Sequence, residues 1–585
     1  MIINHLNRTW RSFALAALFA AFSQHTKAQD LTTKYERSGA RETVTYAECI
    51  DYWKTLVRRF PQLHIREIGA TDAGFPLHLV TLSPDRDFDY ASLHRKNRRI
   101  ILINNGIHPG EPDGIDATMM LVRDLCLGKK KLPANVTLAI IPIYNIGGAL
   151  NRSEFFRVDQ NGPDAFGSRG NAQNLDLNRD FIKADSRNAR TFHQIYHLTD
   201  PDVFVDNHVS NGADYQHVMT LLATQHGKLG GVMGAYLHDT FEPALYKMMA
   251  EKGYDLLPYV NHFGPTPDSG WTAFADGPRY SSGYTTLFHT FGFVPETHML
   301  KPYKQRVEAT YALMECFIRF TSENSNKIKA LRDATRASVK TQESFPLSWQ
   351  PDVSRPQLYT FKGYEAGYKP SEVSGLPRLY YDRNKPYEKQ IRIFNHFEPD
   401  NFVTKPEAYI IPQGWWTVIE LLQNNKVQMK RLTRDTIITV EVYTIKDIKT
   451  VAQPYEKHYM HHGVTTETSQ QKIAFRKGDY LIPMNQAANR FVVETLEPKG
   501  ADSYFAWNFF DAILGKKEGY STYVFEDTAG EFLRQNPEVR KALETRRASD
   551  SSFAKSGGDQ LNFVYRQSPW NEPGFMRYPV FRIVK

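Results

Sequence analysis

The sequence predicts an α/β fold, with a mostly parallel or mixed central sheet flanked by helices, followed by a second, mixed α+β domain. Between about residues 42 and 325, short apolar segments alternate with amphipathic helix-like segments, as in sheets covered by helices. After about residue 324 this alternation stops, and strand-like and helix-like segments become mixed. A chain of 585 residues also exceeds the roughly 250–300 residues at which one core stops growing, so two domains are expected.

The first 28 residues have the layout of a secretory signal peptide. Arg8 and Arg11 precede an apolar run at 12–22, and a small-x-small cleavage site follows at 26–28. The run is too short to span a bilayer, and Gln29 rather than cysteine follows the cleavage point, which argues against a lipid anchor. A buried N-terminal helix is the alternative. We expect an exported protein, periplasmic or extracellular, without a membrane span.

The first domain is expected to cover residues 29–325. Its strand-like segments are short and apolar, and they lie at 77–82, 100–107, 136–144, 203–205, 218–223 and 292–296. Amphipathic helix-like segments accompany them, at 115–127, 186–198, 229–252 and 304–320. Ligands bind such sheets beyond the carboxyl ends of the strands, so functional residues are expected there.

A linker is expected at 326–344, because the sequence around 341–358 is polar and contains proline. The second domain, 345–585, is expected to be mixed α+β, and nothing in its sequence indicates a role. Its strand-like segments lie at 389–394, 408–411, 436–445 and 472–481. Its helix-like segments lie at 415–423, 505–514 and 529–545.

Composition excludes several classes of protein. Charged residues make up 23% of the chain and the mean hydropathy is −0.49, which argues against an integral membrane protein. The formal charge of +8 includes three basic residues of the leader, and the remainder is too dispersed to predict nucleic-acid binding. Three scattered cysteines are too few for a disulfide framework.

The first candidate site residues, His108 and Glu111, directly follow the strand-like segment 100–107. A Pro-Gly pair turns the chain between them, so both side chains can meet on one zinc ion. A second H-x-x-E match, His64 to Glu67, lies in a strand-like stretch. Residues three apart in a strand point to opposite faces, so we discard it.

A catalytic zinc ion usually has three protein ligands, and His208 is the best third candidate. It follows the apolar segment 203–205, about 100 residues after Glu111, so the two meet only if neighbouring strands bring them together. A structural histidine is the alternative. Between Glu111 and His208, Asn178 and Arg179 combine an amide with a bidentate guanidinium, which suits a carboxylate. A solvated or structural Arg179 paired with Asp180 is the alternative.

In this order, the motifs resemble those of the zinc carboxypeptidase (metallocarboxypeptidase) family. H-x-x-E lies at 108–111, D-L-N-R at 176–179 and D-N-H at 206–208. The glutamate that the family has downstream, at the end of a strand, is matched by Glu296. The resemblance covers about residues 40–325 and implies a divergent secreted member with a C-terminal extra domain.

The resemblance implies one zinc ion per catalytic domain, bound by His108, Glu111 and His208. It also implies that Glu296 is the general base, which takes a proton from the attacking water and passes it to the leaving amine.

Other positions match the family's substrate-binding and supporting residues. Asn178 and Arg179 match those that hold a terminal carboxylate, so the implied substrate is a peptide with a free C-terminus. Asp176 matches the carboxylate that orients the first zinc histidine. Arg169 resembles an arginine that stabilises the oxyanion in a cytosolic branch of the family.

Some features leave alternatives open. The family often has a tyrosine on a mobile loop over the substrate, and Tyr280 and Tyr284 both qualify. An amino-acid deacylase of the succinylglutamate desuccinylase–aspartoacylase type, with a similar zinc site, is an alternative function, and an inactive peptide-binding relative is another. A cluster of His458, His461 and His462 looks metal-like, but it lacks a carboxylate at ligand spacing.

Overall fold

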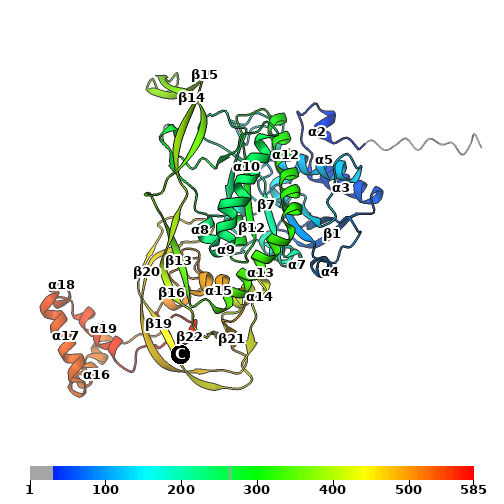
Figure 1. The fold of residues 1–585 in the computed structure, drawn as a ribbon. Helices are drawn as coiled ribbons and strands as arrows, with labels where there is room; N and C mark the ends of the chain where they lie inside the picture. Colours follow the sequence, from blue (N-terminus) through cyan, green and yellow to red (C-terminus); the bar gives the residue numbers. More distant parts are fainter. Residues whose placement is uncertain (1–30, 263, 265, 585) are drawn as a thin grey trace, which may run out of the picture.

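The computed structural model describes residues 31–262, 264 and 266–584 (Figure 1). The proposed signal peptide, residues 1–28, lies outside the described residues. None of the helices in the described part of the chain combines the length and the hydropathy needed to cross a membrane.

A nine-stranded mixed sheet forms the centre of the first domain, which confirms the predicted fold class. Each of the six predicted strand-like segments contains one of its strands. The central pairs, β3 with β4, β3 with β7 and β7 with β12, are parallel, whereas the pairs nearer the edges are mostly antiparallel. The main path is β1 (Leu63–Ala70), β2 (Pro76–Leu82), β4 (Val136–Ile141), β3 (Arg99–Asn104), β7 (Val203–Asp206), β12 (Phe291–His298), β9 (Met219–Ala223) and β10 (Leu257–Pro258), with β8 (His208–Ser210) beside β12.

Helices cover this sheet. Strands β3, β4 and β7 are buried at every residue, which agrees with their mostly apolar, non-alternating sequences. Helix α12 packs on β3, β4 and β12, whereas α7 packs on β1, β2 and β3. The helices are α2 (Lys34–Arg37), α3 (Tyr46–Arg59), α4 (Tyr90–Arg95), α5 (Asp113–Cys126), α6 (Ile146–Leu150), α7 (Arg187–Thr199), α11 (Ser281–Thr286) and α12 (Tyr303–Glu323). Short elements are β5 (Arg152–Ser153), β6 (Phe166–Gly167), η1 (Leu177–Arg179) and η3 (Pro267–Ser269).

The helix predicted at 229–252 is confirmed over residues 231–250, but it contains a π-helical turn and does not continue across Gly230. Gly230 and Gly231 have positive φ angles of 70° and 53°, which end one helix and start another. A π-helical turn then precedes Pro243, which lies in the first turn of the last piece. The pieces are α8 (His226–Leu229), α9 (Gly231–Tyr236), η2 (Leu237–Phe241) and α10 (Glu242–Ala250).

The predicted linker at 326–344 is also mostly helix, α13 (Ser325–Thr341), and it packs against α9. Its polar sequence was misleading because Arg332 is buried, with ion pairs to Asp200 and Asp202 at 3.0 and 2.7 Å. A strand, β13 (Ser344–Pro351), follows almost directly.

The C-terminal part contains three sheets. A six-stranded sheet has the order β18 (Lys430–Arg431), β21 (Tyr480–Pro483), β17 (Ala408–Ile411), β22 (Phe581–Ile583), β19 (Thr436–Thr450) and β20 (His461–Phe475). A long hairpin of β14 (Gln357–Pro370) and β15 (Pro377–Phe394) pairs with β11 (Trp271–Thr272) of the first domain. β13 pairs with β16 (Phe397–Thr404). One hydrophobic core runs through both domains, from Leu31 to Val580.

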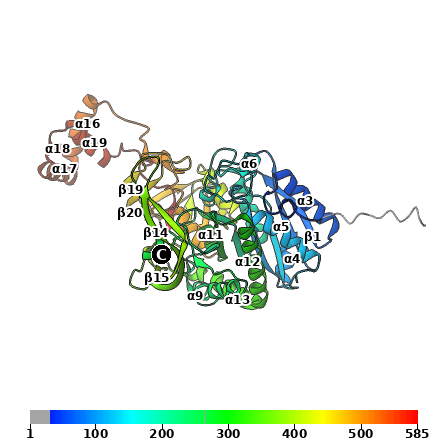
Figure 2. The ribbon, with the colours of Figure 1, turned by 90° about the horizontal axis from the view of Figure 1, so that it is seen from above.

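The helices of this part differ from two predictions. Residues 505–514 form turns and the short η4 (Asp511–Leu514), with a positive φ of 65° at Asn508, instead of a helix. The helix expected at 529–545 is split before Pro537. The helices are α14 (Trp416–Asn424), α15 (Asn489–Leu496), α16 (Thr522–Gln535), α17 (Pro537–Ser549), α18 (Ser551–Ala554) and α19 (Gly557–Gln567). Helices α16–α19 stand away from the body of the molecule (Figure 2).

Candidate functional site

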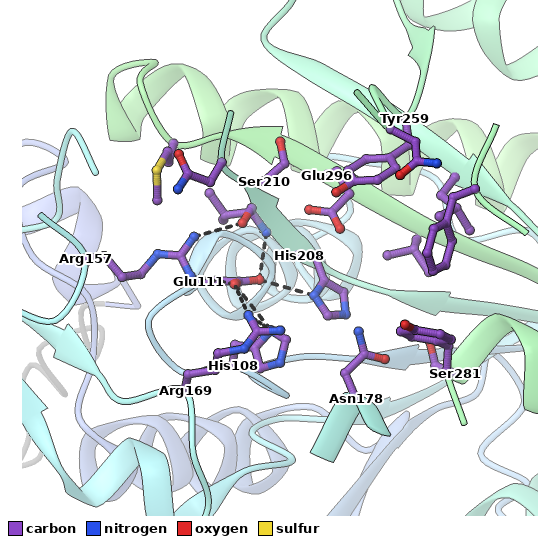
Figure 3. Close-up of a pocket in the computed structure, with 18 of the residues that line it drawn as sticks. His108, Glu111, Arg157, Arg169, Asn178, His208, Ser210, Tyr259, Ser281 and Glu296 are labelled. Carbon is purple, nitrogen blue, oxygen red and sulfur yellow. Dashed lines mark hydrogen bonds and ion pairs between the residues drawn. The ribbon is translucent and has the colours of Figure 1, made fainter. Parts of the chain in front are cut away.

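The three predicted metal ligands converge at the carboxyl ends of neighbouring strands. His108 and Glu111 lie in the turn after β3, and His208 starts β8 after β7, the parallel neighbour of β3. All three residues are buried, and one potential ligand atom of each lies within 4.8 Å of the others. The Nδ1 atoms of His108 and His208 lie 3.3 and 3.2 Å from the two Glu111 carboxylate oxygens (Figure 3).

The other ring nitrogen of each histidine faces a carboxylate. His108 Nε2 lies 2.9 Å from Asp176 Oδ1, and His208 Nε2 lies 3.2 Å from Asp206 Oδ2. A proton held on each Nε2 leaves the Nδ1 lone pair free to bind a metal. Two imidazole nitrogens and a carboxylate in a buried position fit zinc, so the residues present suit the ion.

Arg169 supports this assignment of the His108 tautomer. Its Nη1 lies 3.2 Å from His108 Nδ1, and a guanidinium can only donate, so this nitrogen accepts. Its Nε and Nη2 donate to Asp176 Oδ2 at 3.0 and 2.9 Å. The structure thus brings Arg169 and Asp176 together with the first histidine.

Glu111 has a partner that the sequence did not reveal. Arg157 Nη1 lies 2.6 Å from Glu111 Oε1, and the Val209 amide donates to Oε2 at 2.8 Å. Burial raises the pKa of Glu111, but Arg157 and His108 outweigh burial and hold it well below its usual range. Glu111 is therefore an anion, as a carboxylate that binds a metal has to be. No motif marks Arg157, which lies in the loop between β5 and β6.

Glu296 lies on β12, in register with His208 on β8, and both line one cavity (Figure 3). Burial raises the pKa of Glu296 to about 8. The Glu111 carboxylate also raises this pKa, whereas His208 lowers it. A cation held by the three candidate ligands would lower the pKa of Glu296 again. A carboxylate whose pKa can approach the working pH is suited to accept and return a proton.

Asn178 and Arg179 line the same cavity from η1, whose N-cap is Asp176. The Arg179 guanidinium stacks over the Tyr280 ring, 4.5 Å from its centroid, and its Nε donates to the Tyr455 hydroxyl at 2.9 Å. These contacts hold the planar fork in one position.

Of the two tyrosines left open by the sequence, Tyr280 lines the cavity. Tyr284 is fully buried, stacks on His193 and donates to Asn425 Oδ1 at 2.6 Å, so it cannot cover a substrate from this position. Tyr259 also lines the cavity, near Glu296, and was not predicted (Figure 3).

The cavity has a volume of about 560 Å³ and both polar and apolar walls. Besides the site residues, its lining includes a group of apolar side chains, among them Phe156, Val158, Leu222, Phe274, Val294 and Met299. A cavity with one apolar wall and convergent charged groups is typical of a binding site for a small ligand.

The C-terminal part reaches the site through a turn between β19 and β20. Besides the contact of Tyr455 with Arg179, Glu456 accepts a hydrogen bond from the Asp176 amide at 2.9 Å. His458, in the same turn, contacts Asp185 at 2.7 Å. No sequence motif links these partners, which are separated by 273 to 280 residues.

The histidine cluster near this turn does not gather around one point. His458 contacts Asp185, whereas His461 contacts a different carboxylate, that of Asp511, at 2.9 Å. His462 is exposed.

Comparison with known proteins agrees with the arrangement of the site. Residues 49–247 match the family model for zinc carboxypeptidase. Carboxypeptidase 2 of Trichophyton equinum is 19% identical over 455 residues, covering 71% of this chain and 74% of the relative. Carboxypeptidase 2 of Trichophyton rubrum is 19% identical over 439 residues, with the same coverage.

Solved structures that resemble the chain include carboxypeptidase A from Helicoverpa armigera, with a TM-score of 0.37 and 15% identity over 58% of this chain and 83% of that one. A putative carboxypeptidase A from Shewanella denitrificans has a TM-score of 0.36 and 16% identity over 48% of this chain and 69% of that one. The segment that matches the zinc carboxypeptidase model contains the three candidate metal ligands together with Asn178 and Arg179.

Proposed function

We propose that this protein is an exported, zinc-dependent metallocarboxypeptidase that removes C-terminal residues from peptides. The observation that carries the proposal is that one cavity contains the three ligands, Glu296 and Arg179. The three candidate ligands and Glu296 suit hydrolysis, and Arg179 suits a substrate with a free carboxylate. Export rests on the leader-like sequence at 1–28.

The charged residues of the cavity supply the chemistry of this reaction. Zinc, when bound by His108, Glu111 and His208, lowers the pKa of a coordinated water to about 7 and polarises the scissile carbonyl. Glu296 accepts a proton from the attacking water and returns it to the leaving amine nitrogen. Arg169 keeps Nε and Nη2 on Asp176, and its Nη1, which leaves His108 Nδ1 when that atom binds the metal, donates to the carbonyl oxygen as negative charge develops there.

The remaining residues position the substrate. Asn178 and Arg179 bind the terminal carboxylate through an amide and a bidentate fork. The stacking of Tyr280 on Arg179 keeps the fork oriented before substrate arrives, so less entropy is lost on binding. The apolar wall, which includes Leu222 and Phe274, offers a surface for an apolar substrate side chain.

The ligand assignment is tested by replacing one histidine. His208→Ala should bind zinc at this centre at least about 100-fold more weakly and lose hydrolysis with it. Zinc content by mass spectrometry and peptide hydrolysis are measured together, with the exposed His462→Ala as the matched control. An unchanged zinc content in His208→Ala, with activity retained, would remove His208 from the ligand set.

A further inference from the structure

A second group of three histidines lies near the candidate site, because His226 lines a small pocket with Leu222, Tyr259 and Phe274, which also line the cavity described above. His226 is the first residue of α8, His238 lies in the π-helical turn η2, and His396 lies between β15 and β16. One ring nitrogen of each lies within 4.8 Å of the others. Within the described residues, this group and the candidate zinc ligands are the two sets of His, Cys, Asp or Glu side chains gathered closely enough to hold a metal ion.

The spacing of the rings matches that of ligands around one ion. Nε2 of His226 lies 3.3 Å from Nδ1 of His396. In a tetrahedral site with zinc–nitrogen bonds of about 2.0–2.1 Å, neighbouring nitrogens lie about 3.3–3.4 Å apart. The ring of His238 is 4.3 Å from that of His226 and 5.2 Å from that of His396, between centroids.

His238 also has the outer partner that metal-binding histidines usually have. Its Nδ1 lies 2.7 Å from Asp239 Oδ1, so the carboxylate holds the proton on Nδ1 and leaves the lone pair on Nε2. The Gln357 side chain reaches that Nε2 at 2.5 Å through its amide nitrogen.

Two features of the backbone place these rings together. Gly227 allows α8 to approach β16, because a Cβ at this position would lie 2.7 Å from the Phe397 carbonyl oxygen. The π-helical turn shifts the register of the helix at His238, and such turns are frequent at functional sites. His226 and His238 thus come from neighbouring helices of the first part of the chain, whereas His396 comes from the C-terminal part, 170 residues after His226.

We propose that His226, His238 and His396 bind a second divalent transition-metal ion, zinc, which ties the C-terminal part to the first domain. Imidazoles without thiolates suit zinc, copper and nickel rather than the harder calcium or magnesium. The ion joins α8 and η2 to the connection that follows the long β14–β15 hairpin. This site is separate from the candidate catalytic centre and does not depend on the proposed reaction.

The proposal is tested by counting zinc ions in the full chain. After equilibration with excess zinc and removal of free metal, mass spectrometry should find two equivalents in the wild type and one in either His396→Ala or His208→Ala. The double variant should hold none, and the exposed His462→Ala should hold two. One equivalent in the wild type, or two in His396→Ala, would overturn the proposal.

A second measurement covers the case in which His396→Ala fails to fold. In His208→Ala loaded with Co²⁺, the remaining site should give the visible absorption bands of four-coordinate cobalt. Adding Asp239→Asn, which keeps the side-chain size, should weaken cobalt binding by about 10–100-fold. Absence of the bands in folded His208→Ala, or equal affinity with and without Asp239→Asn, would contradict the assignment.

Discussion

At the scale of single residues, the site depends on side chains whose charge and orientation are fixed by neighbours. Glu111 stays ionised because Arg157 and His108 outweigh its burial, and both ligand histidines have carboxylates on their outer nitrogens. Arg179 is held between the Tyr280 ring and the Tyr455 hydroxyl. Preorganisation of this kind reduces the ordering that a substrate must bring about.

Arg179→Ala should therefore impair mainly the binding of a free C-terminal carboxylate. Loss of a charge-assisted, bidentate contact is worth about 3 kcal/mol, or roughly a 100-fold fall in kcat/KM for free-acid peptides. Steady-state kinetics on free-acid and C-terminally amidated forms of one peptide measure the effect. The exposed Arg187→Ala serves as the control for removal of a positive charge. An equal loss on both forms of the peptide would contradict the carboxylate role of Arg179.

The motifs of the sequence singled out His108, Glu111, His208 and Glu296, and the structure brings these four residues to one cavity. Their roles stay predictions. Arg157 was missed because an arginine in a loop has many partners open to it, and only the folded chain shows that it meets Glu111.

At the scale of elements, parallel strands assemble the site. β3, β7 and β12 are neighbours, so residues after β3, in β8 and on β12 meet at one edge although they are far apart in the chain. The sequence predicted these strands because they are buried and continuously apolar. The breaks at Gly230 and Pro537, and helix α13, were missed because helical periodicity alone does not show where tertiary contacts end a helix or bury an arginine.

The turn at 455–458 is an element that the sequence did not connect with the site. Tyr455→Phe removes one hydrogen bond to Arg179, which is worth about 1 kcal/mol, so KM for free-acid peptides should rise about fivefold with kcat unchanged. Tyr459→Phe, on an exposed tyrosine of the same segment, is the matched control. A fall in kcat at constant KM, or no change at all, would show that the turn does not position Arg179.

At the scale of the whole molecule, the core and the helical module behave differently. The main core contains residues of both domains, including Phe345, Val418 and Phe491, so the first domain would lose part of its core if the chain ended near 341. Helices α16–α19 have their own small core around Phe525 and Leu561.

Replacement of residues 519–571 by a short Gly-Ser linker should leave folding and peptidase activity unchanged. The ends of this segment already lie together, because the Lys517 amide donates to Glu572 Oε1 at 2.8 Å. Thermal melting and hydrolysis of a free-acid peptide are compared with those of the full chain. A chain that ends at residue 341 provides the contrast and should not fold. An insoluble or inactive excision variant would show that the module supports the catalytic part.

The most direct test of the proposed function is a mass-spectrometric time course on the zinc-loaded protein. The substrates are a pool of peptides in free-acid and C-terminally amidated forms, and Glu296→Gln is the control. Stepwise loss of single C-terminal residues from the free acids alone, reduced at least about 1,000-fold in Glu296→Gln with its zinc retained, is the predicted result. Intact peptides in both forms, or equal trimming by Glu296→Gln, would contradict a carboxypeptidase in which Glu296 is the base.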